Sequence, residues 1–180
     1  LIGRKIEENP WVRQARIQRI FPRQVVIRVE EREPVAIVNL GYLYYVDAGG
    51  EVFKVLAASD SLDYPVVTGF NAERLGAGDA REKDRMKQVI ALLKALEGRE
   101  YFTGRQVSEV SLEPGGGLSV YALEGVRIRF GQGDYARKLS RLERIYGYLK
   151  PKMAMLDYID LNVDEKVIVR IEQSPGVTKI

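Results

Sequence analysis

Residues 131–136 read Gly-Gln-Gly-Asp-Tyr-Ala, which is the spacing of the glycine-rich turn that binds dinucleotide phosphates. Asp134 stands where a phosphate would meet the helix N-terminus, and its carboxylate repels an anion while it caps the helix. No acidic residue ends a strand about 20 positions later, and the neighbouring elements look antiparallel, without repeated strand–helix–strand units. The sequence therefore predicts a helix cap and turn here, and no small-molecule substrate.

Catalytic and metal-binding residues are scarce in this chain. It contains neither His nor Cys, which excludes imidazole bases, thiolate nucleophiles and Cys/His zinc sites. Asp157 and Asp160 could form a carboxylate pair, but strand residues three apart point to opposite faces. Residues 115–117 are three glycines that lead into a strand without a following lysine, so they form a loop. We therefore expect no enzyme activity, no cofactor and no metal site.

The basic residues of the second predicted helix could bind an anionic partner. They are Arg137, Lys138, Arg141 and Arg144. Core leucines and tyrosines alternate with them and no aromatic platform lies beside them, so a solvated face is favoured over a nucleic-acid site. The whole chain has 28 basic and 25 acidic residues, an imbalance too small for a nucleic-acid-binding footprint.

The 180 residues are 46% hydrophobic and 29% charged, the composition of an ordinary globular protein with one or two domains. The longest apolar run, residues 89–93, is far shorter than the ~20 residues that cross a bilayer. Residues 1–40 have a net charge of +3 and residues 41–70 a net charge of −3. This change, together with Gly41, predicts a boundary between two modules near residue 40.

Apolar periodicity predicts about ten short strands and two amphipathic helices, after a helix end that stops before Pro10. The predicted helices are residues 80–97 and 134–149. The predicted strands are residues 12–21, 25–29, 36–40, 42–46, 52–55, 107–112, 118–123, 126–130, 158–163 and 167–171. This pattern predicts an α+β fold.

Specific local sequences recur in a fixed order along the chain. The first forty residues contain Asn9-Pro10-Trp11-Val12, Ala15-Arg16-Ile17, Phe21-Pro22 and Pro34-Val35-Ala36, and the later stretches are residues 46–53, 62–69, 126–131, 158–161 and 167–169. Together they resemble the bacterial cell-division protein family FtsQ/DivIB. The early sequences are similar to the second half of its POTRA domain, and the later ones are similar to successive elements of its β-domain.

The resemblance implies a domain organisation and a function. It implies a partial POTRA domain over residues 1–40, without its first strand and helix, then a mainly antiparallel β-domain over 41–173 and a tail over 174–180. The implied protein is a non-enzymatic scaffold of the division septum, held in the cytoplasmic (inner) membrane by a single-pass anchor outside this sequence, with this region on the extracytoplasmic, periplasmic side. The implied partners are FtsB/FtsL-like division proteins, and further division proteins through the POTRA domain.

A POTRA-bearing component of an outer-membrane assembly or secretion machinery, which handles unfolded β-strands, is the alternative. It predicts several tandem POTRA units or a long barrel of alternating strands. Residues 41–180 contain neither pattern, so the scaffold is the preferred interpretation.

The resemblance also implies that a partner adds a strand at the C-terminal edge of the β-domain. The implied contact residues are Val163, Asp164, Glu165, Lys166, Val167, Ile168, Val169, Arg170 and Ile171. Residues 166–171 are strongly β-prone, and the Ser-Pro-Gly at 174–176 limits further pairing.

A terminal strand of this kind commonly lies at a sheet edge, where unpaired backbone groups accept another strand. Alternation predicts that Val167, Val169 and Ile171 face the core. Lys166, Ile168 and Arg170 are then on the opposite face. An edge that Lys166 and Arg170 merely protect from pairing is the alternative.

Overall fold

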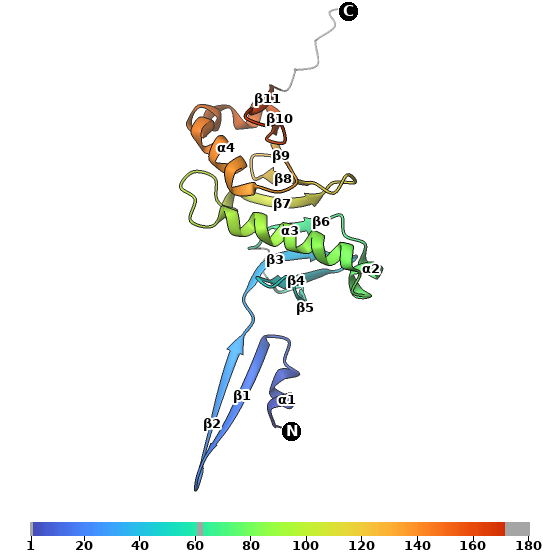
Figure 1. The fold of residues 1–180 in the computed structure, drawn as a ribbon, viewed down its shortest axis with the longest axis vertical. Coiled ribbons are helices and arrows are strands. Elements are labelled where there is room, and N and C mark those ends of the chain that lie inside the picture. Colours follow the sequence, from blue (N-terminus) through green and yellow to red (C-terminus); the bar gives the residue numbers. More distant parts are fainter. Residues whose placement is uncertain (1, 61–62, 172–180) are drawn as a thin grey trace, which may run out of the picture.

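The computed structural model describes residues 2–60 and 63–171, and the tail over 174–180 lies outside the described residues. The α-helices are α1 (Ile2–Glu7), α2 (Ala72–Gly76), α3 (Ala80–Leu96) and α4 (Tyr135–Leu149), with 3-10 turns at Gly104–Gln106 and Lys150–Met155. The strands are β1 (Val12–Ile20), β2 (Gln24–Glu31), β3 (Pro34–Asn39), β4 (Leu43–Asp47), β5 (Val52–Val55), β6 (Val66–Thr68), β7 (Val107–Leu112), β8 (Leu118–Ala122), β9 (Arg127–Gly131), β10 (Leu156–Asp160) and β11 (Ile168–Ile171). Figure 1 shows an elongated molecule, with the β1–β2 hairpin at one end and β10 and β11 at the other.

The hairpin is a separate two-stranded sheet. β1 and β2 pair antiparallel, with Ala15 opposite Val29 and Ile17 opposite Ile27. The Glu7 side chain of α1 accepts a hydrogen bond of 2.9 Å from the backbone N–H of Ala15, which ties the short helix to the hairpin. These apolar pairs give the hairpin one apolar face, as the alternating sequence predicts.

The other strands form one nine-stranded sheet in the order β11-β10-β9-β8-β7-β6-β3-β4-β5. Five neighbouring pairs are antiparallel, whereas β3–β6, β6–β7 and β9–β10 are parallel. A parallel pair needs a crossover, and helices supply two of them: α2 and α3 join β6 to β7, and α4 joins β9 to β10. The α+β class is therefore confirmed.

The antiparallel surroundings expected for the glycine motif are wrong, because β9, α4 and β10 form a strand–helix–strand unit. The capping role expected for Asp134 is also wrong. Its backbone is left-handed, with φ of 46°, and its side chain makes no capping hydrogen bond. The short elements β6 and α2 were not predicted because three and five residues are too few to establish a period.

The hydrophobic core lies between the sheet and helices α3 and α4 (Figure 1). α3 buries Met86, Val89, Leu92 and Leu96, and α4 buries Leu139, Leu142 and Tyr146 among other residues. Both sets follow the helical period, so each helix places one apolar stripe on the sheet, as the sequence predicts.

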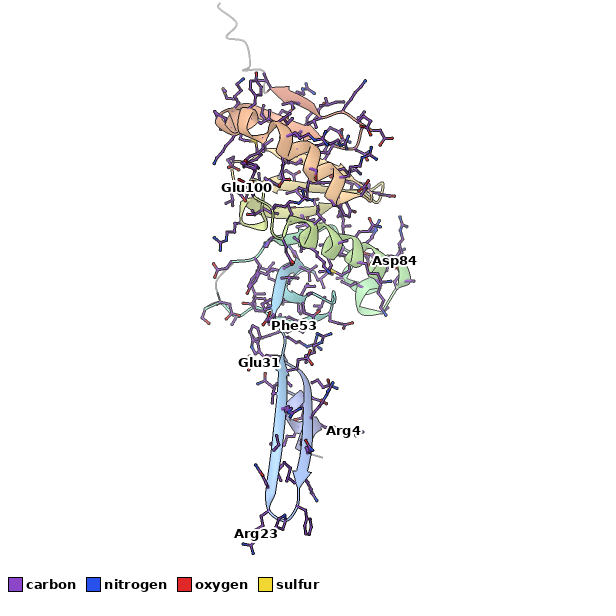
Figure 2. The ribbon with its side chains drawn as sticks, turned by 60° about the vertical axis from the view of Figure 1, so that its left-hand side comes forward. Arg4, Arg23, Glu31, Phe53, Asp84 and Glu100 are labelled. Atoms are coloured by element: carbon purple, nitrogen blue, oxygen red, sulfur yellow. The ribbon has the colours of Figure 1, made fainter. Side chains whose placement is uncertain are left out.

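The two sheets meet at an aromatic cluster. The ring of Trp11, the only tryptophan in the sequence, lies 5.4 Å from that of Tyr45 and 5.5 Å from that of Phe53. The Lys54 ammonium lies 5.2 Å from the Trp11 ring centre, within cation–π range. In Figure 2, the labels of Glu31 and Phe53 mark the region where the hairpin meets the large sheet.

Arg32 reinforces this junction, since its guanidinium forms a 2.6 Å ion pair with Asp47 and its backbone N–H donates to the Trp11 carbonyl. The residues after Arg32 enter β3, which pairs with β4 and β6 in the large sheet. We therefore propose that the domain boundary lies between Arg32 and Pro34, and that Gly41 belongs to the β3–β4 turn.

Two glycines near α4 test the local geometry. Gly131 has φ of 64°, and a Cβ there would overlap the Asn162 side chain, whereas a Cβ on Gly147 in α4 meets nothing within 4 Å. Gly131→Ala should lower the free energy of unfolding by about 2 kcal/mol or more. Gly147→Ala should raise it by about 0.5–1 kcal/mol, because alanine restricts the unfolded chain and favours a helix. Urea denaturation measures both, and equal stability of the two variants would contradict this geometry.

Candidate protein-binding edge

β11 is the last strand of the large sheet. It pairs antiparallel with β10, with Ile159 opposite Val169 and Asp160 opposite Ile168, and no described strand lies on its other side. Every strand of a sheet has hydrogen-bonding groups on both sides. Within residues 2–60 and 63–171, the outer N–H and C=O groups of β11 therefore have no strand partner, and they lie at the end of the molecule remote from the hairpin (Figure 1).

The side chains of the edge alternate as predicted over most of its length. Val167 and Val169 are half-buried and pack against the core, while Lys166, Ile168 and Arg170 are exposed. Ile171 was expected to face the core but is 62% exposed. It is the last paired residue of the strand, beyond a register irregularity next to Leu156, so the core ends before it.

The turn before β11 contains the other predicted contact residues, Val163, Asp164 and Glu165, and all three are exposed. This turn is held by α4. The Arg141 guanidinium donates to the carbonyl oxygens of Leu161 at 2.6 Å, Val163 at 2.7 Å and Lys166 at 3.0 Å.

One cation of α4 thus joins the end of β10 to the start of β11. Arg137 adds an ion pair with Glu165. Together these two arginines place the open edge relative to the core.

The neighbouring Lys138 holds the turn that contains the glycine motif. Its side chain is buried, and its ammonium donates to the carbonyl oxygens of Phe130 at 2.7 Å and Gln132 at 2.6 Å. Burial lowers the pKa of Lys138, with a smaller contribution from the charge of Arg141. The expectation that the basic face of α4 is solvated is therefore wrong for Lys138 and Arg141, whose charges bind backbone carbonyls.

Charged side chains flank the open edge. Arg170 forms an ion pair of 3.4 Å with Asp157 and lies 6.0 Å from the Tyr158 ring centre. Both partners of this pair are at least half exposed, so it contributes little to stability. A basic side chain on β11 can also discourage unspecific pairing, as the alternative interpretation of the sequence proposed.

The opposite edge of the sheet, β5, is more protected. Lys54 points inward over Trp11 and Tyr45 and forms a 3.1 Å ion pair with Asp60. Asp60 also accepts a hydrogen bond from the Ala57 backbone N–H, and this bond and the Lys54 side chain lower the pKa of Asp60. An inward-pointing charge and an adjacent loop are devices by which proteins block edge pairing. Among the described residues, β11 has neither device.

The chain matches two family models. Residues 36–162 match the C-terminal part of the cell division proteins FtsQ/DivIB, and residues 1–32 match the FtsQ-type POTRA domain. The chain belongs to the FtsQ/DivIB family. The resemblance read from the sequence is thereby confirmed, and the assembly or secretion component is not favoured, since both models are of the FtsQ type.

Several relatives named cell division protein FtsQ are similar over most of the chain. The protein of Geotalea daltonii is 43% identical over 94% of this chain and 62% of its own length, and that of Syntrophotalea carbinolica is 43% identical over 95% and 61%. The FtsQ of Anaeromyxobacter sp. (strain K) is 37% identical over 80% of this chain and 49% of its own length. The chain thus spans less than two thirds of these relatives.

The predicted contact residues, 163–171, lie beyond residue 162, where the match to the C-terminal model ends, so their role in binding stays a prediction. Sequence reasoning missed Arg141 as part of this site. In the sequence, Arg141 is only one of several basic residues on the face of a predicted helix. Its contact with residues 161–166 depends on how that helix packs in the tertiary structure. Among the helices of the described residues, none is long and apolar enough to cross a membrane.

Replacing Arg141 should loosen the open edge. Arg141→Met removes three charge-assisted hydrogen bonds to carbonyls and should lower the free energy of unfolding by about 2–3 kcal/mol. It should also speed amide hydrogen exchange in β11. Arg144→Met, at an exposed position of the same helix, is the matched control and should change neither quantity. Unchanged exchange in β11 with Arg141→Met would show that this side chain does not hold the edge.

Proposed function

We propose that this protein is a non-enzymatic scaffold of the bacterial division machinery, and that it recruits FtsB/FtsL-like partners by strand addition at β11. The observation that carries the proposal is the open edge of β11 in a member of the FtsQ/DivIB family. At the other edge, β5 contains Lys54, which points inward and pairs with Asp60 of the adjoining loop, so β11 would be the better acceptor.

The partner strand would pair with the outer backbone groups of Ile168–Ile171, and the turn at Val163–Lys166 would extend the contact. Backbone pairing supplies affinity in this mode of recognition, and alternate side chains supply specificity. Ile168 and Arg170 are exposed and would meet partner side chains, while Val167 and Val169 keep the strand on the core. The core packing of these valines would reduce the entropic cost of binding, since the edge is already ordered.

We further propose that residues 1–33 are the second half of a POTRA domain and that residues 34–171 are the β-domain. On β2, Val25, Ile27 and Val29 are each about half exposed, which leaves an apolar face for the first strand and helix of a POTRA domain to cover. The same proposal places the protein in the cell envelope, single-pass in the inner membrane, with this region on the extracytoplasmic side and with the POTRA domain open to further division proteins.

The scaffold would act without nucleotide or metal. One support is the absence of His and Cys from the sequence. Another is Lys138, whose ammonium is already hydrogen-bonded to the carbonyl oxygens of Phe130 and Gln132 at the glycine turn. A ligand that binds only the folded state raises the melting temperature. Since we expect no site for ATP, NAD or zinc, none of the three should change the melting temperature in a thermal-shift assay. An increase of several degrees with any of the three would contradict a role as scaffold alone.

Strand addition predicts a specific effect of proline in β11. Ile168→Pro should weaken binding of the FtsB-like partner from the same organism more than tenfold, because proline removes a backbone donor and bends the strand. Ile168→Ala keeps the backbone and should weaken binding much less. Pull-down or calorimetry with wild type and both variants, each first checked for folding by circular dichroism, measures the difference. Equal binding by the three proteins would rule out β11 as the docking edge.

A further inference from the structure

A groove lies between the β4–β5 hairpin and the helices α2 and α3, on the side of the large sheet that carries the core (Figure 1). Its volume is about 590 Å³, and cavities of about 300–1,000 Å³ are typical of binding sites. Its apolar lining consists of four half-buried side chains and one buried methionine: Leu40, Tyr44, Val52, Leu75 and Met86. The half-buried side chains pack on the core and also keep apolar surface open to the groove, where another molecule would cover it.

The turn between β4 and β5 bounds the groove where it meets α3. Gly50 in this turn has φ of 80°, and a Cβ there would lie only 2.9 Å from Met86 Cγ. The turn thus approaches α3 as closely as a glycine permits. The two walls of the groove are therefore held together at a fixed point by the fold itself.

The backbone groups at this turn are already hydrogen-bonded. The N–H groups of Gly49 and Glu51 donate to the Asp47 carboxylate at 2.9 and 3.0 Å, and the Gly50 N–H donates to the Asp47 carbonyl oxygen at 2.9 Å. β4 is paired on both sides, with β3 and β5. An extended occupant would find no strand to pair with in the groove, whereas an α-helix satisfies its own backbone groups. The groove therefore favours a helix.

The walls of the groove carry opposite charges that do not pair with each other. On α3, Lys83 has no hydrogen bond or ion pair within residues 2–60 and 63–171. Lys87 pairs only with Asp84, at 2.9 Å, and both side chains are more than two-thirds exposed, so this pair contributes little to stability. On the opposite wall, the carboxylate of Glu51 has no partner among the described side chains. An occupant with carboxylates toward α3 would complement this arrangement.

We propose that this groove binds an amphipathic helix of a partner protein, with its acidic residues beside α3. The apolar residues of the helix, spaced by three or four, pack on the lining at Leu75 and Met86, as in other proteins that bind a helix in a groove. Lys83 and Lys87 lie one turn apart on α3, so acidic side chains one turn apart on the bound helix match their spacing. Glu51 repels an acidic residue on the other side, which gives the helix one orientation.

The lysines and the apolar lining together select the class of partner. A small anion would use the two ammonium groups and leave the lining exposed to water. A purely apolar segment would leave the charges of Lys83 and Glu51 without complement. The proposal does not rest on strand addition, because β4 and β5 lie at the opposite edge of the sheet from β11. The two surfaces would hold different partners.

Selection from a phage-displayed library of random peptides tests this inference, with the 180-residue chain as the target. The peptides have about 15 residues, enough for four helical turns. The selected sequences should combine acidic residues with apolar residues spaced by three or four. Fluorescence anisotropy with a labelled selected peptide then compares the variants.

Each wall of the groove has its own expected effect. Lys83→Gln/Lys87→Gln should weaken peptide binding about tenfold, Leu75→Ser should weaken it about tenfold, and Glu51→Gln should strengthen it about twofold. Arg105→Gln/Arg144→Gln removes the same charge at exposed positions elsewhere and should bind as wild type does. Circular dichroism checks the folding of each variant, and the lysine variant changes exposed side chains only.

A benzophenone on the apolar face of the selected peptide locates the bound helix. Photo-crosslinking and mass spectrometry should place the adduct in residues 72–90, which form the helical wall of the groove. A library that yields no binder, peptides that are basic, or binding that the groove variants leave unchanged would overturn the proposal. Binding that Ile168→Pro abolishes and the groove variants do not would also overturn it, and would leave the role proposed for β11 intact.

Discussion

The structure depends on burying one apolar face of a nine-stranded sheet under α3 and α4. Each helix lies in the connection between two parallel neighbouring strands, so the same segments that close the core also determine the strand order. Met86, Val89 and Leu92 from α3 and Leu139 and Leu142 from α4 fill the space between the layers. Loss of either stripe would expose the inner face of the sheet to water, and the remaining hydrogen bonds contribute too little net free energy to replace it.

The nine-stranded sheet is open and has two edges, β5 and β11, and the charged residues near them are placed differently. At β5, Lys54 points inward among aromatic rings and pairs with Asp60 of the adjoining loop, a placement of charge that discourages edge pairing. At β11 the cations come from the core side, since Arg141 of α4 binds the carbonyls of the preceding turn and orders the strand without covering its outer groups. The two edges of the sheet therefore differ in how the charged side chains near them are placed.

The aromatic junction determines how the ends of the molecule relate. Trp11 packs against Tyr45 and Phe53, and Arg32 pairs with Asp47 at the end of β4, so the residues just before β1 and just after β2 attach the hairpin to the large sheet. Cation–π contacts and a partly buried ion pair have specific geometry. They therefore fix the orientation of the hairpin relative to the large sheet more closely than buried apolar area alone would. The turn of the hairpin and the open edge of β11 are thereby held at opposite ends of one elongated molecule (Figure 1).

The sequence by itself determined the hairpin, the two long helices, most of the strands and the family, because these features depend on local periodicity and on motifs read in order. It also indicated residues 166–171 as a terminal strand. Only the tertiary structure decided that β9 and β10 are parallel, that Lys138 and Arg141 bind backbone carbonyls, and that Ile171 lies outside the core. The physical reason is that strand order and the partner of a buried charge depend on residues far apart in the chain, which no local pattern records.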